Sequence, residues 1–293
     1  MVQEKTVTII CGPTAVGKTA YAVELAKKGN AEIISADSGP IYRGLDIGTA
    51  KPTVEERQEV VFHLLDIIDP SQRFNAADFR NLALQKIGEI QARGKRVLVV
   101  GGTGLYVKVL EEGIFTGPSA DPGIRARLEE RCRAGGVELL HQELQKIDPV
   151  AAEKIPVKNR QRIIRALEVY EITGRPISEF WKISRTRLTG LAKLGLTLSR
   201  ETLNRRINAR VDQMISRGWV EETATLLSRW GAEAPGLQII GYKELVSHLQ
   251  GKISRAEAIE QIKLHTRQYA KRQMTWFKRD SEICWKPPNF LTT

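Results

Sequence analysis

Residues 7–19, VTIICGPTAVGKT, contain the spacing of glycine, lysine and threonine that forms a phosphate-binding loop between a strand and a helix. The stretch VTIIC is apolar and β-branched, and the residues after Lys18 recur at helical spacing. In such a loop, backbone N–H groups surround phosphate oxygens, the lysine adds positive charge, and the threonine hydroxyl can bind Mg²⁺. The predicted phosphate-binding residues are Gly12, Pro13, Thr14, Ala15, Val16, Gly17, Lys18 and Thr19.

Two further apolar runs, residues 31–37 (AEIISAD) and 96–102 (RVLVVGG), end in polar residues or glycine. Between them, residues 75–95 have helical periodicity with Asn75 at the N-cap position. Strands that alternate with helices predict an α/β fold with a parallel sheet flanked by helices. Ligands bind at the carboxyl ends of such strands. The phosphate loop, Asp37 and Thr103 all fall at these ends.

The character of the sequence changes after Ile114. TGPSADPG is rich in turn residues, and charged helical segments without a strand-like run follow it to about residue 189. The stretch KLGLTLSR then returns the chain to the sheet. We therefore predict a first part of the core at 1–115, a helical insertion domain at 116–190, and a second part of the core with a basic C-terminal helix at 191–293.

Composition points to a polyanionic partner. The 293 residues carry a formal net charge of +11, which is high for an enzyme of small metabolites alone. The three cysteines form no metal-binding or disulfide pattern. No segment approaches the ~20 apolar residues of a membrane span, and no basic start leads into an apolar leader. We expect a cytoplasmic, monomeric protein that has no membrane partner.

The polar residues at the strand ends do not suit a kinase. A kinase of this class needs an acidic residue after an apolar strand to hold Mg²⁺, but residues 96–103 end in Gly101, Gly102 and Thr103. The acid at a strand end is Asp37, which could equally be a turn residue. If the bound diphosphate is a leaving group and no phosphoryl group is transferred, the loop, Lys18 and Mg²⁺ would neutralise its charge. Asp37 could then take a proton from an acceptor amine.

Several motifs in the same order resemble those of bacterial tRNA dimethylallyltransferases, also called isopentenyl-tRNA transferases. The resemblance covers nearly the whole chain and rests on GPTAVGKT, DSGPIYRGLDIGTAKP, HLLDIIDP, FNAADF, VGGTGLYVKVL, SADP, RIIRALEVYEITGRPIS, IIGYKEL and TRQYAKRQMTWFK. It implies a P-loop kinase-like fold with a helical insertion. It also implies transfer of a dimethylallyl group from dimethylallyl diphosphate to N6 of adenine 37, beside the tRNA anticodon.

The resemblance implies roles for particular residues. Asp37 would be the general base, Thr19 with Mg²⁺ and Lys18 would hold the diphosphate, and Arg210 would act on the diphosphate side. The family segments that touch tRNA correspond here to Asp37, Ser38, Gly39, Pro40, Thr103, Arg125, Gln161, Arg162, Ile163, Ile164, Arg165, Gly241, Tyr242, Lys243, Lys271, Arg272 and Gln273.

Two positions depart from the family pattern. Relatives often have Ala-Leu in place of Gly39-Pro40, which bears on how a flipped base is held, and some have arginine in place of Lys243. Three other functions remain open from the sequence: a small-molecule P-loop kinase, an RNA-binding module that uses nucleotide as a switch, and an isopentenyltransferase that acts on free adenylate. Basic stretches within 154–165 and 263–278 favour tRNA.

Overall fold

The computed structural model describes residues 7–115, 117–181 and 187–288. Within these residues, six strands form one sheet in the order β3-β2-β4-β1-β5-β6, and every neighbouring pair is parallel. The strands are β1 (Val7–Cys11), β2 (Ala31–Ser35), β3 (Phe62–His63), β4 (Arg96–Gly101), β5 (Leu191–Leu196) and β6 (Cys284–Lys286). β1 is central, because β4 pairs with one of its edges and β5 with the other.

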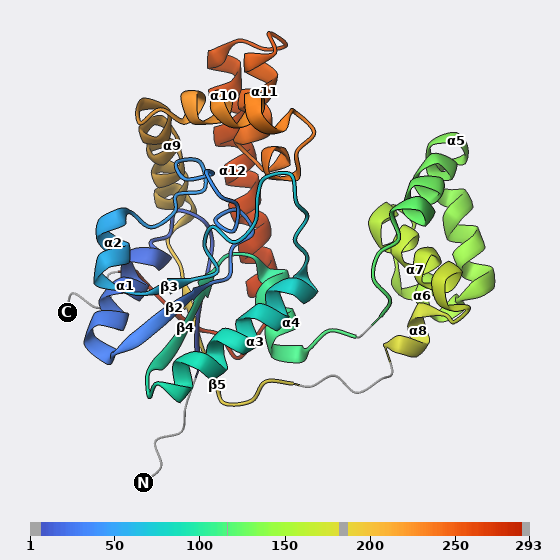
Figure 1. Ribbon diagram of the computed structural model, residues 1–293, viewed down its shortest axis with the longest axis horizontal. Coiled ribbons are helices and arrows are strands. Elements are labelled where there is room, and N and C mark those ends of the chain that lie inside the picture. The colour runs from blue at the N-terminus through green and yellow to red at the C-terminus, as the bar shows by residue number, and fades with distance from the viewer. Residues whose placement is uncertain (1–6, 116, 182–186, 289–293) are drawn as a thin grey trace. The chain divides into compact units, whose positions relative to one another are not determined.

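Helices cover both faces of the sheet, as the alternation of side chains along a strand requires. On one face, Ile10 and Leu98 pack with residues of α1, including Ala22. Figure 1 shows α3 and α4 on the other side of the sheet from α1. The helices of this part of the chain are α1 (Lys18–Gly29), α2 (Val54–Glu59), α3 (Ala76–Ala92) and α4 (Gly104–Glu112). The predicted fold class, a parallel α/β sheet flanked by helices, is confirmed.

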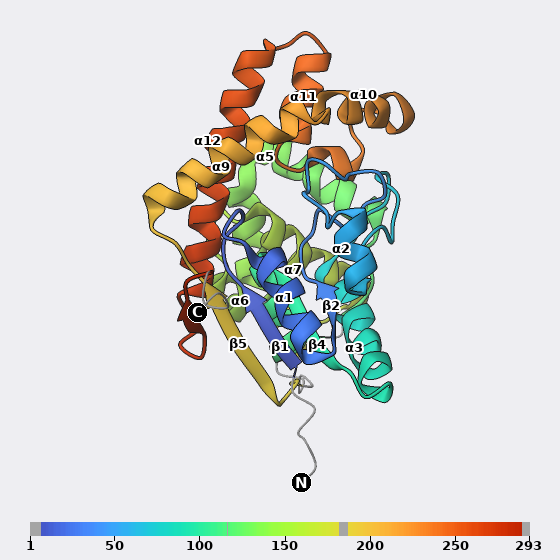
Figure 2. The same cartoon turned by 90° about the vertical axis from the view of Figure 1, so that its left-hand side faces the viewer.

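A group of helices lies beyond the carboxyl ends of the strands, where β1 runs into the phosphate loop (Figures 1 and 2). Its buried side chains come from the segment around Ile41 and from the helices that follow β5. These elements are α9 (Arg200–Ser216), α10 (Trp219–Trp230), the 3₁₀ helix η1 (Pro235–Gln238), α11 (Tyr242–Leu249) and α12 (Arg255–Phe277). The helices therefore enclose the ligand-binding edge of the sheet.

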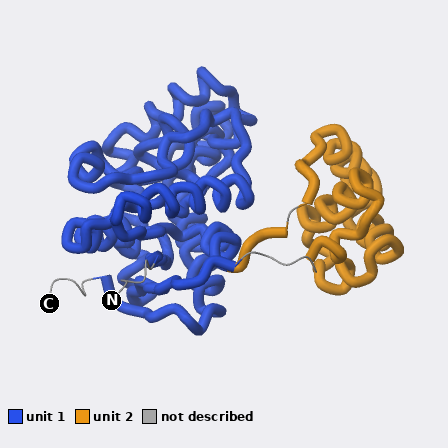
Figure 3. The backbone as a smooth tube through the Cα atoms, turned by 60° about the horizontal axis from the view of Figure 1, so that its bottom comes forward, with its two compact units in different colours: residues 1–111, 187–293 blue, residues 112–186 orange. Residues whose placement is uncertain are grey.

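The chain divides into two compact units, residues 1–111 with 187–293 and residues 112–186 (Figure 3). The second unit has its own apolar core, which includes Leu128, Leu140 and Leu167. Its helices are α5 (Pro122–Ile147), α6 (Pro149–Lys154), α7 (Arg160–Thr173) and α8 (Ile177–Phe180). The boundaries predicted from sequence, after residues 115 and 190, lie a few residues beyond these. Residue 116, the predicted start of the insertion, is outside the described residues.

Sequence periodicity located the four longer strands and the start of α3. The Asn75 side chain caps α3 by accepting the N–H groups of Ala77 and Asp78. The outermost strands, β3 and β6, have two and three residues and were not predicted from the sequence. Such short segments carry no readable alternation, and only their pairing with a neighbouring strand identifies them.

One glycine permits the closest contact within the sheet. A Cβ atom on Gly101, the last residue of β4, would lie 2.3 Å from the carbonyl carbon and oxygen of Ala36. We expect Gly101→Ala to lower the free energy of unfolding by about 1–3 kcal/mol, because the two backbones would have to separate. Denaturant unfolding measures this change.

Gly88 provides the matched control, since it lies on the exposed side of α3 and a Cβ there meets no atom within 4 Å. Gly88→Ala should raise the free energy of unfolding by about 0.5–1 kcal/mol, the usual gain in helix propensity. Equal effects at the two positions would show that the close approach at Gly101 is not a constraint.

Candidate active site

The phosphate loop connects β1 to α1, as predicted, and Lys18 turns back over it. The Lys18 Nζ atom donates hydrogen bonds to the carbonyl oxygens of Gly12 (3.1 Å) and Pro13 (3.0 Å). Burial lowers the pKa of Lys18, and the negative charge of Asp37 opposes that shift. Beneath the loop, burial raises the pKa of Cys11 to about 12, so this thiol remains protonated and unreactive.

Asp37 follows β2 and is held against the end of β4. Its Oδ1 atom accepts the backbone N–H of Gly102 at 2.5 Å. The next residue, Ser38, donates its N–H to the hydroxyl of Thr103 at 3.1 Å. Among the described residues, no other hydrogen bond to the Asp37 carboxylate is made. The second carboxylate oxygen is therefore free to accept a proton.

Gln273 of α12 joins the phosphate loop to the end of β4. Its Nε2 atom donates to the carbonyl oxygen of Gly102 at 2.9 Å, and its Oε1 atom accepts the backbone N–H of Thr14 at 2.8 Å. The side chain is almost completely buried. The sequence predicts Gln273 as a tRNA-binding residue; in the structure its contacts fix the geometry of the loop beside Asp37.

Two arginines of α9 face the phosphate loop. Arg210 Nη1 lies 3.4 Å from the Thr14 hydroxyl, and Arg206 Nη1 donates to the carbonyl oxygen of Val16 at 3.3 Å. Burial lowers the pKa of Arg210, and Asp37 opposes the shift. Arg206 was not among the residues predicted from the sequence. Its position four residues before Arg210 was a usable signal, because residues at this spacing share one face of a helix.

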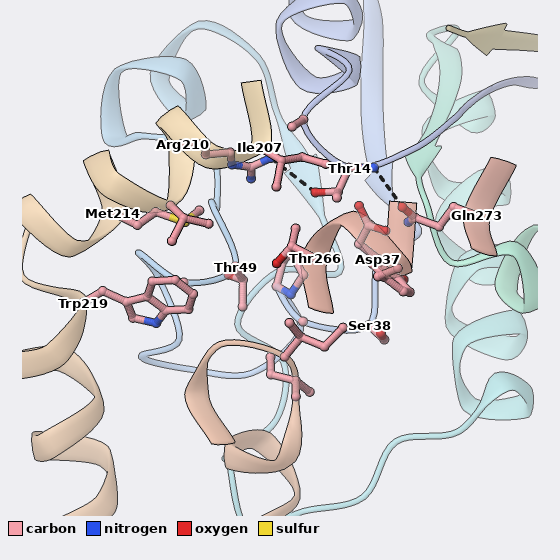
Figure 4. Close-up of a pocket in the computed structure, with 18 of the residues that line it drawn as sticks. Thr14, Asp37, Ser38, Thr49, Ile207, Arg210, Met214, Trp219, Thr266 and Gln273 are labelled. Carbon is pink, nitrogen blue, oxygen red and sulfur yellow. Dashed lines mark hydrogen bonds between the residues drawn. The ribbon is translucent and has the colours of Figure 1, made fainter. Parts of the chain in front are cut away.

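Two adjoining cavities open at these residues, with volumes of about 350 and 500 Å³. Both are lined by Thr14, Lys18, Asp37 and Arg210. The smaller cavity continues between apolar side chains of α9 and α10 (Figure 4). The larger one is more polar and is lined also by Thr19, Ser35 and Arg206. A single ligand can thus place a charged group at the phosphate loop and an apolar group in the smaller cavity.

Residues 38–40, 48 and 49 form one wall of the smaller cavity. The segment that carries them is anchored by two charged side chains, the buried Lys51 and the half-buried Glu222. Lys51 Nζ donates to the carbonyl oxygen of Tyr42 (2.6 Å) and to the carboxylates of Asp46 (2.6 Å) and Asp66 (2.5 Å). These contacts leave Thr49 in the wall. The lysine is buried and its carboxylate partners are partly exposed. These contacts hold the loop in one arrangement, because breaking them would leave the buried cation without a partner.

The second anchor is Glu222 of α10, whose carboxylate accepts three consecutive backbone N–H groups. They belong to Asp46 (3.1 Å), Ile47 (2.8 Å) and Gly48 (3.3 Å). The hydroxyl of Tyr242 donates to the same carboxylate at 2.5 Å. Neither anchor was predicted. The contacts of Glu222 join segments that are far apart in the sequence, and those of Lys51 lie within an irregular loop that has no readable periodicity.

The predicted tRNA-binding residues of the first unit fall into three groups. Ser38, Gly39 and Pro40 line the smaller cavity, and Thr103 supports Ser38. Gly241 and Tyr242 are buried, where Tyr242 holds Glu222. The side chains exposed to solvent are Lys243, Lys271 and Arg272.

The predicted residues of the insertion divide in the same way. Gln161 and Arg162 are exposed at the start of α7. Ile163 and Ile164 are buried in the apolar core, so their side chains face away from solvent. Arg125 and Arg165 both pair with the buried carboxylate of Glu168, at 2.9 and 2.7 Å. These two arginines thus compensate a buried charge within the insertion.

Fold and site together define a parallel α/β protein in which a phosphate loop, two arginines and a carboxylate meet at the carboxyl edge of the sheet. The family described as IPP transferase matches residues 40–280, and the chain belongs to that family. The predicted enzyme class, a transferase, is confirmed with it, and the kinase and switch alternatives are set aside.

Named relatives cover almost the whole chain. A tRNA dimethylallyltransferase of Geobacter metallireducens is 50% identical over 97% of this chain and 93% of its own. A solved tRNA isopentenylpyrophosphate transferase of Bacillus halodurans is 44% identical with a TM-score of 0.71, over 97% of this chain and 90% of its own. A eukaryotic dimethylallyltransferase solved while acting on tRNA is 30% identical with a TM-score of 0.84, over 99% of this chain and 75% of its own.

The depressed pKa of Lys18 gives a testable pH dependence. Its ammonium should lose its proton below the ordinary lysine pKa of about 10.4. The affinity for inorganic pyrophosphate should therefore fall as pH rises toward that value. Lys18→Arg, which keeps its charge, should show a flatter profile, and Lys28→Arg on the exposed end of α1 should behave as the parent. Titration calorimetry across alkaline pH measures this, and identical profiles for the parent and Lys18→Arg would contradict it.

Proposed function

We propose that the protein transfers the dimethylallyl group of dimethylallyl diphosphate to N6 of the adenine at tRNA position 37 and releases diphosphate. The observation that carries this proposal is the composition of the smaller cavity. Among the described residues, Asp37 is its only carboxylate, and it faces the same space as Lys18, Arg210 and the phosphate loop. The names of the relatives are consistent with this reaction.

The phosphate loop would act on the leaving group. As the bond between C1 of the prenyl group and the diphosphate oxygen breaks, negative charge develops on that oxygen. Lys18, Arg210 and the loop N–H groups supply positive charge where the diphosphate departs, and they require little rearrangement to do so. Arg206 adds a third cation at the larger cavity.

Asp37 would act on the acceptor. The adenine N6 amine is a weak nucleophile, because its lone pair is delocalised into the ring. As the new bond from N6 to C1 forms, the free oxygen of Asp37 takes a proton from N6. The hydrogen bond from Gly102 to Oδ1 orients the carboxylate for this step. The target base must leave its stack to reach the cavity, as bases do in other enzymes that modify them.

Magnesium would be held mainly by the substrate. The described residues contain no group of three or more His, Cys, Asp or Glu side chains placed to hold a metal ion. Thr19, a half-buried hydroxyl in the larger cavity, is the donor that the loop provides. Mg²⁺ commonly combines few protein ligands with phosphate oxygens, so this donor set fits it. The ion would supply additional neutralisation of the diphosphate charge.

RNA binding would use the exposed cations. Lys271 and Arg272 project from α12, and with Trp276 they line a surface hollow. Neither makes an ion pair with a described residue, so both can contact phosphates. Within the insertion, Arg162 at the start of α7 is similarly exposed and makes no ion pair with the part of the chain that the structure describes.

The described helices include none that is long and apolar enough to cross a membrane.

The reaction is tested by incubating the protein with Mg²⁺, dimethylallyl diphosphate and an unmodified anticodon stem-loop that carries adenine at position 37. The RNA should gain the mass of one dimethylallyl group, and a stem-loop with guanine at that position should not. AMP tested in parallel should remain unmodified. Modification of AMP but not of the stem-loop would instead identify an enzyme of free nucleotides.

The role of Asp37 predicts a selective loss of turnover. Asp37→Asn keeps an oxygen that can accept the Gly102 N–H but cannot take a proton from N6. We expect kcat to fall about 10²–10⁴-fold, while the Kd for the stem-loop changes little. Asp69→Asn, at a surface ion pair with Arg43, is the matched control. Unchanged turnover in Asp37→Asn would exclude Asp37 as the base.

A further inference from the structure

Trp219, the first residue of α10, closes the apolar end of the smaller cavity. Its side chain is 2% exposed and lines the cavity beside Val211 and Met214 of α9. Figure 4 shows Met214 and Trp219 at the opposite end of the cavity from Asp37 and Gln273. The cavity thus has a polar end, where the reacting groups would meet, and an apolar end bounded by an indole ring.

The indole ring is fixed in a slot between two glycines. A Cβ atom on Gly48 would lie 2.0 Å from Trp219 Nε1, and one on Gly241 would lie 2.2 Å from the far edge of the ring. The ring of Tyr242 packs edge-on against it, with centroids 5.6 Å apart. Since Gly48 is itself held by Glu222, the slot has rigid walls. The ring is therefore packed between Gly48, Gly241 and Tyr242 and fills the space into which the cavity would otherwise extend.

The indole N–H makes no hydrogen bond. It is a buried polar atom for which the described residues provide no acceptor. An unpaired buried N–H destabilises the folded state. The slot therefore suits the size and shape of the ring rather than its polar group. A position of this kind serves as a steric wall.

A substrate bound at the phosphate loop would direct its hydrocarbon tail toward this wall. Ile207, Val211 and Met214 lie at positions i, i+4 and i+7 of α9, so they share one face and form an apolar track. The track begins near Arg210, at the diphosphate end, and ends at Trp219. A branched five-carbon tail would follow it and meet the indole ring.

We propose that Trp219 is a specificity-determining residue that limits the transferred group to a single five-carbon prenyl unit. This inference rests on the proposed function and names the substrate class that the site excludes, prenyl diphosphates of ten carbons or more. A second prenyl unit would need the volume that the indole occupies. Removing the ring joins its slot to the cavity and provides that volume.

The test compares dimethylallyl and geranyl diphosphate as donors to the same anticodon stem-loop, with RNA mass as the readout. In Trp219→Leu, the ratio of kcat/KM for geranyl to that for dimethylallyl diphosphate should rise at least about tenfold, because even one methylene in an apolar pocket changes kcat/KM by 10–200-fold. Trp219→Phe, which removes one ring, should give a smaller rise. Trp230→Leu, at the other end of α10 and outside the cavity, should leave the ratio unchanged.

Several outcomes would overturn the proposal. One is a parent protein that already uses both donors equally well. Another is a Trp219→Leu variant that still transfers the five-carbon group at an unchanged donor ratio. If Trp219→Leu does not fold, as judged by thermal unfolding, Trp219→Phe decides by the same ratio. A parent protein that transfers no prenyl group from either donor would show instead that the proposed function is wrong, and this inference would fail with it.

Discussion

The contact between the carboxyl ends of β2 and β4 is the constraint on which the site depends. Because Gly101 has no side chain, the backbone at Ala36 can lie against it. Asp37 then reaches the N–H of Gly102, and Gln273 bonds to the carbonyl oxygen of the same residue. Through Thr14, Gln273 extends the connection to the phosphate loop. The backbone N–H and carbonyl groups of one residue, Gly102, thus position both the carboxylate and the loop.

This arrangement separates two tasks that the reaction combines. Positive charge collects on one side of the shared space, where Lys18, Arg206 and Arg210 face the loop. In the smaller cavity, Asp37 is the only carboxylate among the described residues. The burial that lowers the pKa of Lys18 and Arg210 also strengthens their attraction for an anionic group, since little water screens them. A departing diphosphate and an arriving amine would each meet the charge they require.

Local sequence patterns predicted the parts of the structure that depend on neighbouring residues. Glycine spacing identified the loop, and apolar runs identified β1, β2, β4 and β5. Asp37 and Thr103 were predicted because strand ends converge in a parallel sheet. The anchors Lys51 and Glu222, and the wall at Trp219, left no such signal. Glu222 and Trp219 depend on packing against segments far apart in the sequence, and Lys51 depends on the path of an irregular loop. The same residue types elsewhere would be ordinary surface or core residues. Some motif positions that the sequence assigned to RNA binding have a structural role within the insertion. Examples are Ile163 in its apolar core and Arg125 and Arg165 at the buried Glu168.

The central place of β1 in the sheet also sets the order in which a newly synthesised chain can become active. Its first neighbour, β4, leaves the ribosome before the insertion, but β5 follows only after residues 112–186 have been made. At about 5–20 residues per second, one edge of β1 stays unpaired for several seconds. During that interval the insertion can form its separate core. Gln273 emerges later still, so a nascent chain acquires its ligand-binding geometry only after β5, α9 and most of α12 have been made.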